Sequence, residues 1–131
     1  MLSQDARTRI DREVAKYPAD QRQSAVMSAL AIAQDEKGWL PPEAMDFVAQ
    51  YLGMPPVAVY EVATFYAHFD VVQDGEPKPP KVTIRVCDSL SCMMAGAENL
   101  LAALGSEDME DVRIVRAPCI GACDVAPAAE V

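Results

Sequence analysis

The chain has 131 residues, and its 11 basic and 20 acidic side chains give it a formal net charge of −9. A surface this acidic repels phosphate backbones, and the sequence holds no basic stripe with interleaved aromatic residues, so we expect no nucleic-acid partner. Hydrophobic residues make up 51% of the chain, yet no apolar run is long enough to cross a bilayer, and the first residues lack the apolar stretch of a signal peptide. We therefore expect a cytoplasmic, reducing location without direct membrane insertion, where structural disulfides are rare.

Residues 1–70 are predicted to form an N-terminal four-helix bundle. Proline and glycine mark the ends of its short helices: Pro18 interrupts the first, while Gly38 and Gly53 end the second and the third. Pro41-Pro42 and Pro55-Pro56 open the third and the fourth, at a position where helices tolerate proline. Apolar residues recur at helical spacing in each segment: Leu2, Ala6, Ile10, Val14 and Tyr17; Val26, Met27, Leu30, Ala31 and Ala33; Ala44, Phe47, Val48, Tyr51 and Leu52; Val59, Val62, Ala63 and Tyr66.

A proline-dense linker over residues 71–80 is predicted to lead into a strand-helix-strand unit. Val82, Ile84 and Val86 alternate with polar residues in a strand that runs into Cys87, and a second strand over residues 112–116 runs into Cys119. A right-handed crossover makes these strands parallel, so both cysteine-bearing loops are expected at the same edge of the sheet. Four apolar residues on one face, followed by Gly105, predict the helix between the strands: Met94, Ala97, Leu101 and Leu104.

The predicted fold class is therefore α+β, with the helical bundle followed by an α/β domain over residues 81–131. The few residues after Cys123 can begin a third strand but cannot complete a sheet, so this domain is expected to be incomplete at its C-terminus. An unfinished sheet edge favours aggregation. We expect either a partner that completes the edge or, preferably, a longer polypeptide of which these residues are one part.

The only four cysteines form two pairs, Cys87 with Cys92 and Cys119 with Cys123. Structural zinc sites usually use tight Cys-x2-Cys knuckles, whereas four and three residues lie within these pairs. A thiol-disulfide enzyme needs Cys-x-x-Cys at a helix start, and the sequence has none. A 2Fe-2S cluster needs two thiolates on each iron, which is what two pairs on one sheet edge supply. The pattern favours the cluster, with a zinc-stabilised protein-interaction module as the alternative.

Three segments resemble one family: residues 63–69 (ATFYAHF), residues 85–92 (RVCDSLSC) and residues 118–123 (PCIGAC), the last followed by Ala126-Pro127. Over essentially its whole length the chain resembles the thioredoxin-like 2Fe-2S ferredoxin component of the NADH-dehydrogenase module of respiratory complex I, and of related NAD-linked formate dehydrogenases and hydrogenases. The resemblance implies that residues 81–131 form a thioredoxin-like 2Fe-2S domain, in which Pro127 takes the place of the proline before the third strand. It also implies the cluster ligands: Cys87, Cys92, Cys119 and Cys123.

The resemblance further implies partners. The cluster would exchange single electrons with the FMN of an adjacent subunit or fused domain that also binds NAD, and a further catalytic subunit would act on the substrate. Neither FMN nor NAD is expected on this chain. Only 26 residues separate Cys92 from Cys119, fewer than is usual in complex I members, and residues 66–72 (YAHFDVV) and 116–119 (RAPC) look closer to the formate dehydrogenase branch. We expect a formate dehydrogenase-type complex, with complex I or an NAD-reducing hydrogenase as the alternative.

Several residues near these motifs have an ordinary interpretation beside a functional one. His68, the only histidine, is expected to be a polar residue at the end of the fourth helix, because the cysteines already satisfy both irons. Met93 and Met94 are expected to fill gaps, with shielding of the cluster as the alternative. Asp88 and Asp124 are expected to be exposed loop residues rather than groups that tune the cluster. Three aromatic residues fit the core and a docking patch equally well: Phe65, Tyr66 and Phe69.

Overall fold

A computed structural model of the chain describes residues 1–107 and 109–131. The chain forms two compact units, Met1–Lys78 and Pro79–Val131. The division falls inside the predicted linker, residues 71–80. The predicted domain limits, residues 1–70 and 81–131, stay a prediction.

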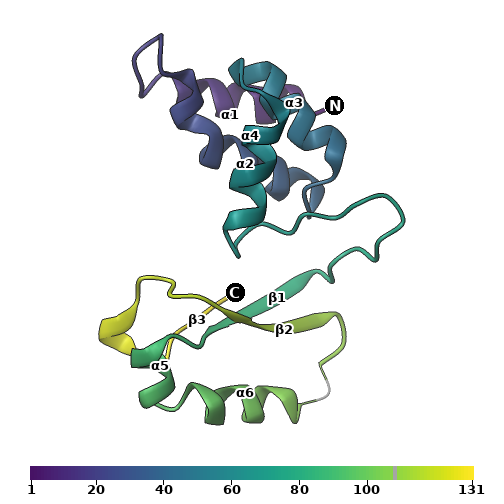
Figure 1. Ribbon diagram of the computed structural model, residues 1–131. Coiled ribbons are helices and arrows are strands. Elements are labelled where there is room, and N and C mark those ends of the chain that lie inside the picture. Colours follow the sequence, from purple (N-terminus) through teal and green to yellow (C-terminus); the bar gives the residue numbers. More distant parts are fainter. Residues whose placement is uncertain (108) are drawn as a thin grey trace. The chain divides into compact units, whose positions relative to one another are not determined.

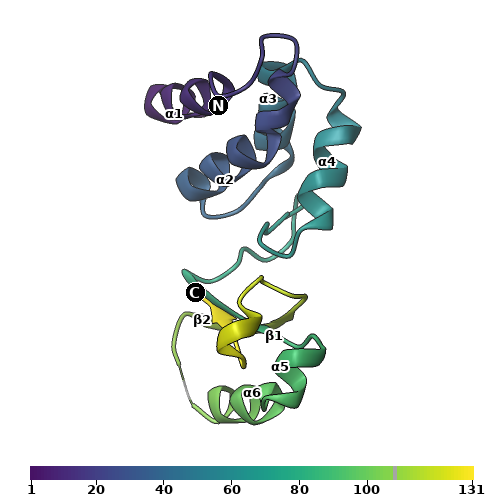
Figure 2. The same cartoon turned by 90° about the vertical axis from the view of Figure 1, so that its left-hand side faces the viewer.

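The first unit is helical, and four α-helices appear where the sequence predicts them (Figures 1 and 2). Ser3 begins the first helix by accepting a hydrogen bond on its hydroxyl from the Ala6 N–H at 3.1 Å. Gly38 and Gly53 end the second and the third in the left-handed conformation, with φ of 84° and 70°. The elements are α1 (Gln4–Val14), a 3-10 turn η1 (Arg22–Ala25), α2 (Val26–Lys37), α3 (Pro42–Leu52) and α4 (Pro56–Phe65).

One apolar core joins the helices of this unit. Most of the predicted stripe residues contribute to it, and Ile10, Leu30 and Val48 are fully buried. Three predictions are wrong: Tyr17, Met27 and Tyr66 are at least 40% exposed. Tyr17 follows the end of α1, Tyr66 caps α4 in an extended conformation, and Met27 lies at the edge of the buried face of α2.

The chain after α4 stays attached to the helical unit instead of leaving it at once. The Gln34 side chain holds this segment at two points, because its Nε2 donates to the His68 carbonyl at 2.9 Å and its Oε1 accepts from the Asp70 N–H at 2.7 Å. Leu40 then forms an isolated parallel bridge with Val71. The first residues of the predicted linker are therefore part of the helical unit.

The second unit is a three-stranded sheet with the order β2-β1-β3 (Figure 1). The predicted parallel pairing is confirmed, since β1 and β2 run parallel in a register from Val82 opposite Val112 to Cys87 opposite Ala117. The third strand pairs with β1 in the antiparallel direction. The elements are β1 (Val82–Cys87), α5 (Leu90–Met94), α6 (Ala97–Gly105), β2 (Val112–Ala117), a 3-10 turn η2 (Cys123–Val125) and β3 (Ala129–Glu130).

The helical region between the strands differs from the prediction. It consists of two helices, α5 and α6, because the chain turns at Gly96, whose φ of 102° suits glycine. Met94 lies on α5 and is 81% exposed, so it does not share a buried face with Ala97 as predicted. Ala97 itself is fully buried at the start of α6.

The central strand β1 is buried on both of its faces. Val86 lies in the apolar core beneath α6, as the alternation predicts, while Val82 at the strand start is 37% exposed. Thr83 and Arg85 point to the other face, and both are buried as well. The Thr83 hydroxyl accepts hydrogen bonds from the Arg113 side chain at 3.0 and 3.2 Å, which satisfies a polar group on that face.

Across the described ranges 1–107 and 109–131, the structure has no helix of the length and apolar character needed to span a bilayer.

Candidate metal centre

The carboxyl ends of the parallel strands β1 and β2 bring the two cysteine loops together. Cys87 is the last residue of β1 and lies opposite Ala117, the last residue of β2. The Asp88 N–H continues the pairing by donating to the Ala117 carbonyl at 3.1 Å. Figures 1 and 2 both show the turn η2, in yellow, beside α5. The predicted convergence of the two loops at one sheet edge is thus present.

All four cysteines are free thiols, and they lie as two pairs of different exposure. Cys87 and Cys92 are buried, and their side chains are hydrogen-bonded to each other. Cys119 and Cys123 are exposed, with 3.5 Å between their sulfur atoms. One pair therefore lies in the core of the unit and the other faces solvent.

The thiols of the two loops affect one another's pKa. A hydrogen bond and the charge of Cys119 raise the pKa of Cys123, and the charges of Cys92 and Cys87 raise it further. The Ala128 N–H lowers the pKa of Cys92, but burial together with the Cys87 and Cys119 thiols raises it overall. Four thiolates at this edge would repel one another, which is the arrangement that bound cations relieve.

Backbone N–H groups are directed at the sulfur atoms. The Ser89 N–H is the largest of several contributions that lower the pKa of Cys87, and the Ile120 N–H contributes in the same direction. The Gly121 N–H lies 3.4 Å from the Cys119 sulfur, and its φ of 82° permits this turn. The two loops thus supply hydrogen bonds to sulfur of the kind that adjust the potential of iron-sulfur clusters.

The donor set fits a binuclear iron-sulfur cluster. Within the described residues, no three or more His, Cys, Asp or Glu side chains gather around one point, so the four cysteines lie as two pairs and not as a ligand set around a single ion. A 2Fe-2S cluster takes two thiolates on each iron, so two adjacent pairs of thiols supply the ligands that it needs. The Ala126–Pro127 peptide bond is cis, and it precedes the strand β3.

An ion-pair network that the sequence did not reveal borders the loops. Arg116 on β2 donates to both carboxylate oxygens of Glu98 on α6, at 2.5 and 2.9 Å, and its Nη1 lies 3.8 Å from Asp88. The pKa of Glu98 is lowered by this hydrogen bonding. Asp88 is half-buried and faces Arg116, rather than being an exposed loop residue as predicted, whereas Asp124 is exposed.

The remaining predicted residues lie at different places. Phe69 is buried in the core of the helical unit, but Phe65 is 79% exposed. His68 is an exposed residue of the turn after α4, and its ring packs edge-on against Phe69. The expectation that Met93 and Met94 fill gaps is wrong, because Met93 is 49% exposed and Met94 is 81% exposed.

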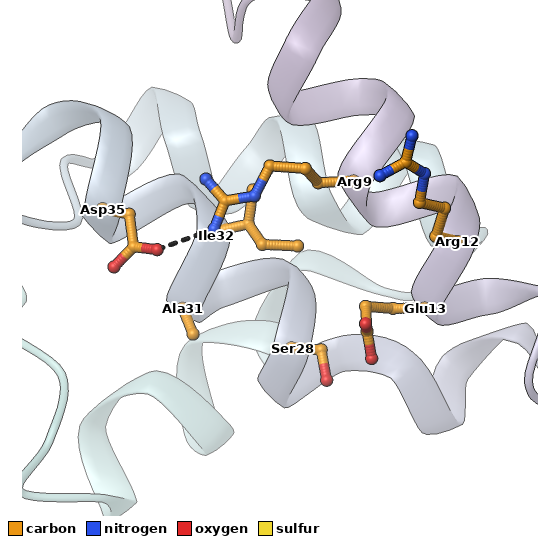
Figure 3. A pocket seen from close by; sticks show the side chains of 7 residues that line it. All are labelled: Arg9, Arg12, Glu13, Ser28, Ala31, Ile32 and Asp35. Atoms are coloured by element: carbon orange, nitrogen blue, oxygen red, sulfur yellow. Dashed lines mark hydrogen bonds and ion pairs between the residues drawn. The ribbon is translucent and has the colours of Figure 1, made fainter.

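A cavity of about 400 Å³ lies between α1 and α2 (Figure 3). None of the predicted site residues lines it. Arg9 forms an ion pair with Asp35 at 2.8 Å across it, and Glu13 pairs with Lys16. The positive and negative side chains that line the cavity largely balance one another, so the cavity is a weaker candidate for a functional site than the cysteine loops. Its lining residues are Arg9, Arg12, Glu13, Ser28, Ala31, Ile32 and Asp35.

The mixed α+β architecture, with a small sheet that carries the cysteines at one edge, is that of a thioredoxin-like iron-sulfur domain. Residues 10–131 match the family described as thioredoxin-like 2Fe-2S ferredoxin, and the chain belongs to this family.

Its relatives include components of NADH-quinone oxidoreductase. The chain is 39% identical to one such component from Rhizobium meliloti, over 95% of this chain and 76% of the relative. It is 32% identical to a component of the Thermus thermophilus enzyme, over 93% and 70% of the two chains, and 34% identical to one from Rickettsia bellii, over 90% and 74%. The family that the sequence motifs resemble is thereby confirmed.

Proposed function

We propose that the chain binds one 2Fe-2S cluster through four cysteines and transfers single electrons within an NAD-linked oxidoreductase complex. The observation that carries this proposal is the convergence of two thiol pairs at the carboxyl edge of two parallel strands, with backbone N–H groups directed at the sulfurs. The ligands are Cys87, Cys92, Cys119 and Cys123.

The residues of this chain position and insulate the cluster rather than act on a substrate. When bound, the cluster supplies a one-electron carrier. Cys87 and Cys92 anchor one side of the site in the protein core, so this side excludes water. Cys119 and Cys123 hold the opposite side at the surface, where electrons can pass to a partner. The Ser89, Ile120 and Gly121 N–H groups stabilise negative charge on sulfur.

A zinc-stabilised interaction module is the competing function, and the EPR spectrum of the reduced protein separates the two. Cysteine variants then test which residues are the ligands. We expect the reduced protein to give a rhombic EPR signal that Cys87→Ser and Cys119→Ser each abolish. His68→Ala is the control, since His68 lies in the other unit and its loss should leave the signal unchanged. A native signal in either cysteine variant would show that the ligands are assigned wrongly.

For the whole complex, we propose that the chain lies beside a subunit or fused domain that binds FMN and NAD, with a further catalytic subunit. The relatives favour an NADH-quinone oxidoreductase type, because components of that enzyme match nearly the whole chain. A formate dehydrogenase type is supported by sequence alone, through the 26 residues between Cys92 and Cys119 and the motifs around His68 and Pro118.

Isolation of the native complex decides between these types. The chain, tagged and purified from its own cells under mild conditions, should carry along a flavoprotein. NAD⁺-dependent formate oxidation by that preparation supports the formate dehydrogenase type, and NADH:quinone activity without formate oxidation supports the complex I type. A preparation in which no flavin accompanies the chain would refute the proposed partner.

A further inference from the structure

Arg116 connects three segments that border the cysteine loops. It lies on β2, three residues before Cys119, and its guanidinium binds Glu98 in the first turn of α6 through two hydrogen bonds. The same guanidinium faces Asp88, the residue directly after Cys87. One positive charge therefore lies between two carboxylates, at the point where both cysteine loops leave the sheet.

The arrangement is geometrically specific. Arg116 lies opposite Val86 in the β1–β2 register, so its side chain projects to the side of the sheet that α6 covers. A planar guanidinium that binds both oxygens of one carboxylate is fixed in orientation, which a single contact does not achieve. Glu98 thereby holds the Arg116 charge close to Asp88 rather than leaving it free in solvent.

We propose that Arg116 is a positioning residue for the iron-sulfur centre. Held by Glu98, it compensates the charge of Asp88 and connects the two points at which the cysteine loops leave the sheet. The proposal rests on the proposed 2Fe-2S function, because the charge acts on the cluster that the cysteines bind. Arg116 is the first residue of the RAPC segment, but Glu98 belongs to none of the segments that resemble the family, so the pairing of the two is not part of the resemblance.

The sign of the electrostatic effect follows from the charges. Reduction adds one negative charge to the cluster, and a nearby cation favours the more negative form. Removal of the positive charge at residue 116 should therefore lower the reduction potential. Removal of the negative charge at Glu98 or Asp88 should raise it. The side chains of Arg116 and Glu98 are about half exposed, so solvent weakens both effects without reversing them.

The test is an EPR-monitored redox titration of the full chain loaded with its cluster. We expect Arg116→Gln to lower the potential, Glu98→Gln to raise it, and Arg116→Lys to stay close to the unmodified protein because it keeps the charge. Arg113→Gln is the matched control: it makes the same charge change on the same strand, but Arg113 binds Thr83 and lies further from the loops. Its shift should be smaller than that of Arg116→Gln.

Cluster retention measures the positioning effect separately. In the presence of an iron chelator, the visible circular dichroism of the cluster should decay up to about fivefold faster in both Arg116→Gln and Arg116→Lys. Neither side chain reproduces the bidentate contact of the guanidinium with Glu98.

Each part of the proposal can fail by itself. Unchanged potentials in Arg116→Gln and Glu98→Gln, shifts of both in the same direction, or an equal shift in Arg113→Gln would overturn the electrostatic role. Unchanged decay rates in both Arg116 variants would overturn the tie between the loops. If the unmodified chain takes up no 2Fe-2S cluster, the proposed function itself is refuted.

Discussion

Replacement of Gln34 by alanine tests how the helical unit holds the segment that follows α4. The variant loses two hydrogen bonds, one to the His68 carbonyl at the surface and one from the partly buried Asp70 N–H. A typical hydrogen bond contributes about 0.5–1.5 kcal/mol to stability, so the two together should contribute about 1–2 kcal/mol, with the exposed one at the lower end.

The assay is urea unfolding of the full chain, followed by circular dichroism at the helical band. Gln50→Ala is the control, because Gln50 is an exposed residue in the last turn of α3, as Gln34 lies in the last turn of α2, and the substitution gives the same gain in helix propensity. The free energy of unfolding should fall by about 1–2 kcal/mol more in Gln34→Ala than in Gln50→Ala. Equal values for the two variants would refute the assigned role of Gln34.

Four further substitutions, one of them a control, test the cores and the charges of the two units. Phe69→Ala should lower the free energy of unfolding by about 3 kcal/mol, while Phe65→Ala, which removes an exposed ring, should change it by less than about 0.5 kcal/mol; similar losses would contradict the assigned burial. Hydrogen bonds from Ser3 lower the pKa of Glu36, so their contribution is complete above the ordinary pKa of 4.5 and is lost as the pH falls through the lowered value. Glu36→Gln should therefore be less stable than the unmodified chain near neutral pH, and the two unfolding curves should converge in acid; a constant difference at all pH values would argue against this pair. Val86→Ala should cost about 2 kcal/mol and speed the thermal loss of the cluster signal, because Val86 is fully buried beside Cys87; an unchanged melting profile would contradict that packing.

Local chemistry explains why the element order could be predicted from the sequence. Gly38 and Gly53 adopt the left-handed conformation that ends a helix, and Pro42 and Pro56 occupy first helical positions. The parallel pairing of β1 with β2 followed from the handedness of strand-helix-strand connections, which needs no long-range information. The parallel pairing places the two cysteine loops at one edge of the sheet.

Periodicity was less informative at the ends and edges of helices. Met27 and Tyr17 continue an apolar pattern, yet they are 42% and 40% exposed. The pattern tells which residues share a face but not how wide a strip the neighbouring helices bury. Gly96 divides one predicted helix into two, because its position permits a turn that the apolar spacing does not reveal.

Contacts between distant segments could not be predicted at all. Arg116 meets Glu98 across 18 residues, and Gln34 reaches His68 and Asp70 across 34 and 36. Polar pairs of this kind depend on the final packing of helices and strands, and a single sequence carries no period or motif that signals them. The exposure difference between the two cysteine pairs is another property of the packed structure.

Native mass spectrometry combined with metal and sulfide analysis of the purified chain tests the central claim most directly. Binding of one cluster by the four cysteines predicts a mass increment of two irons and two sulfides per chain, with matching iron and acid-labile sulfide contents and no zinc. One zinc per chain with no acid-labile sulfide would contradict the claim and establish the zinc-stabilised module instead.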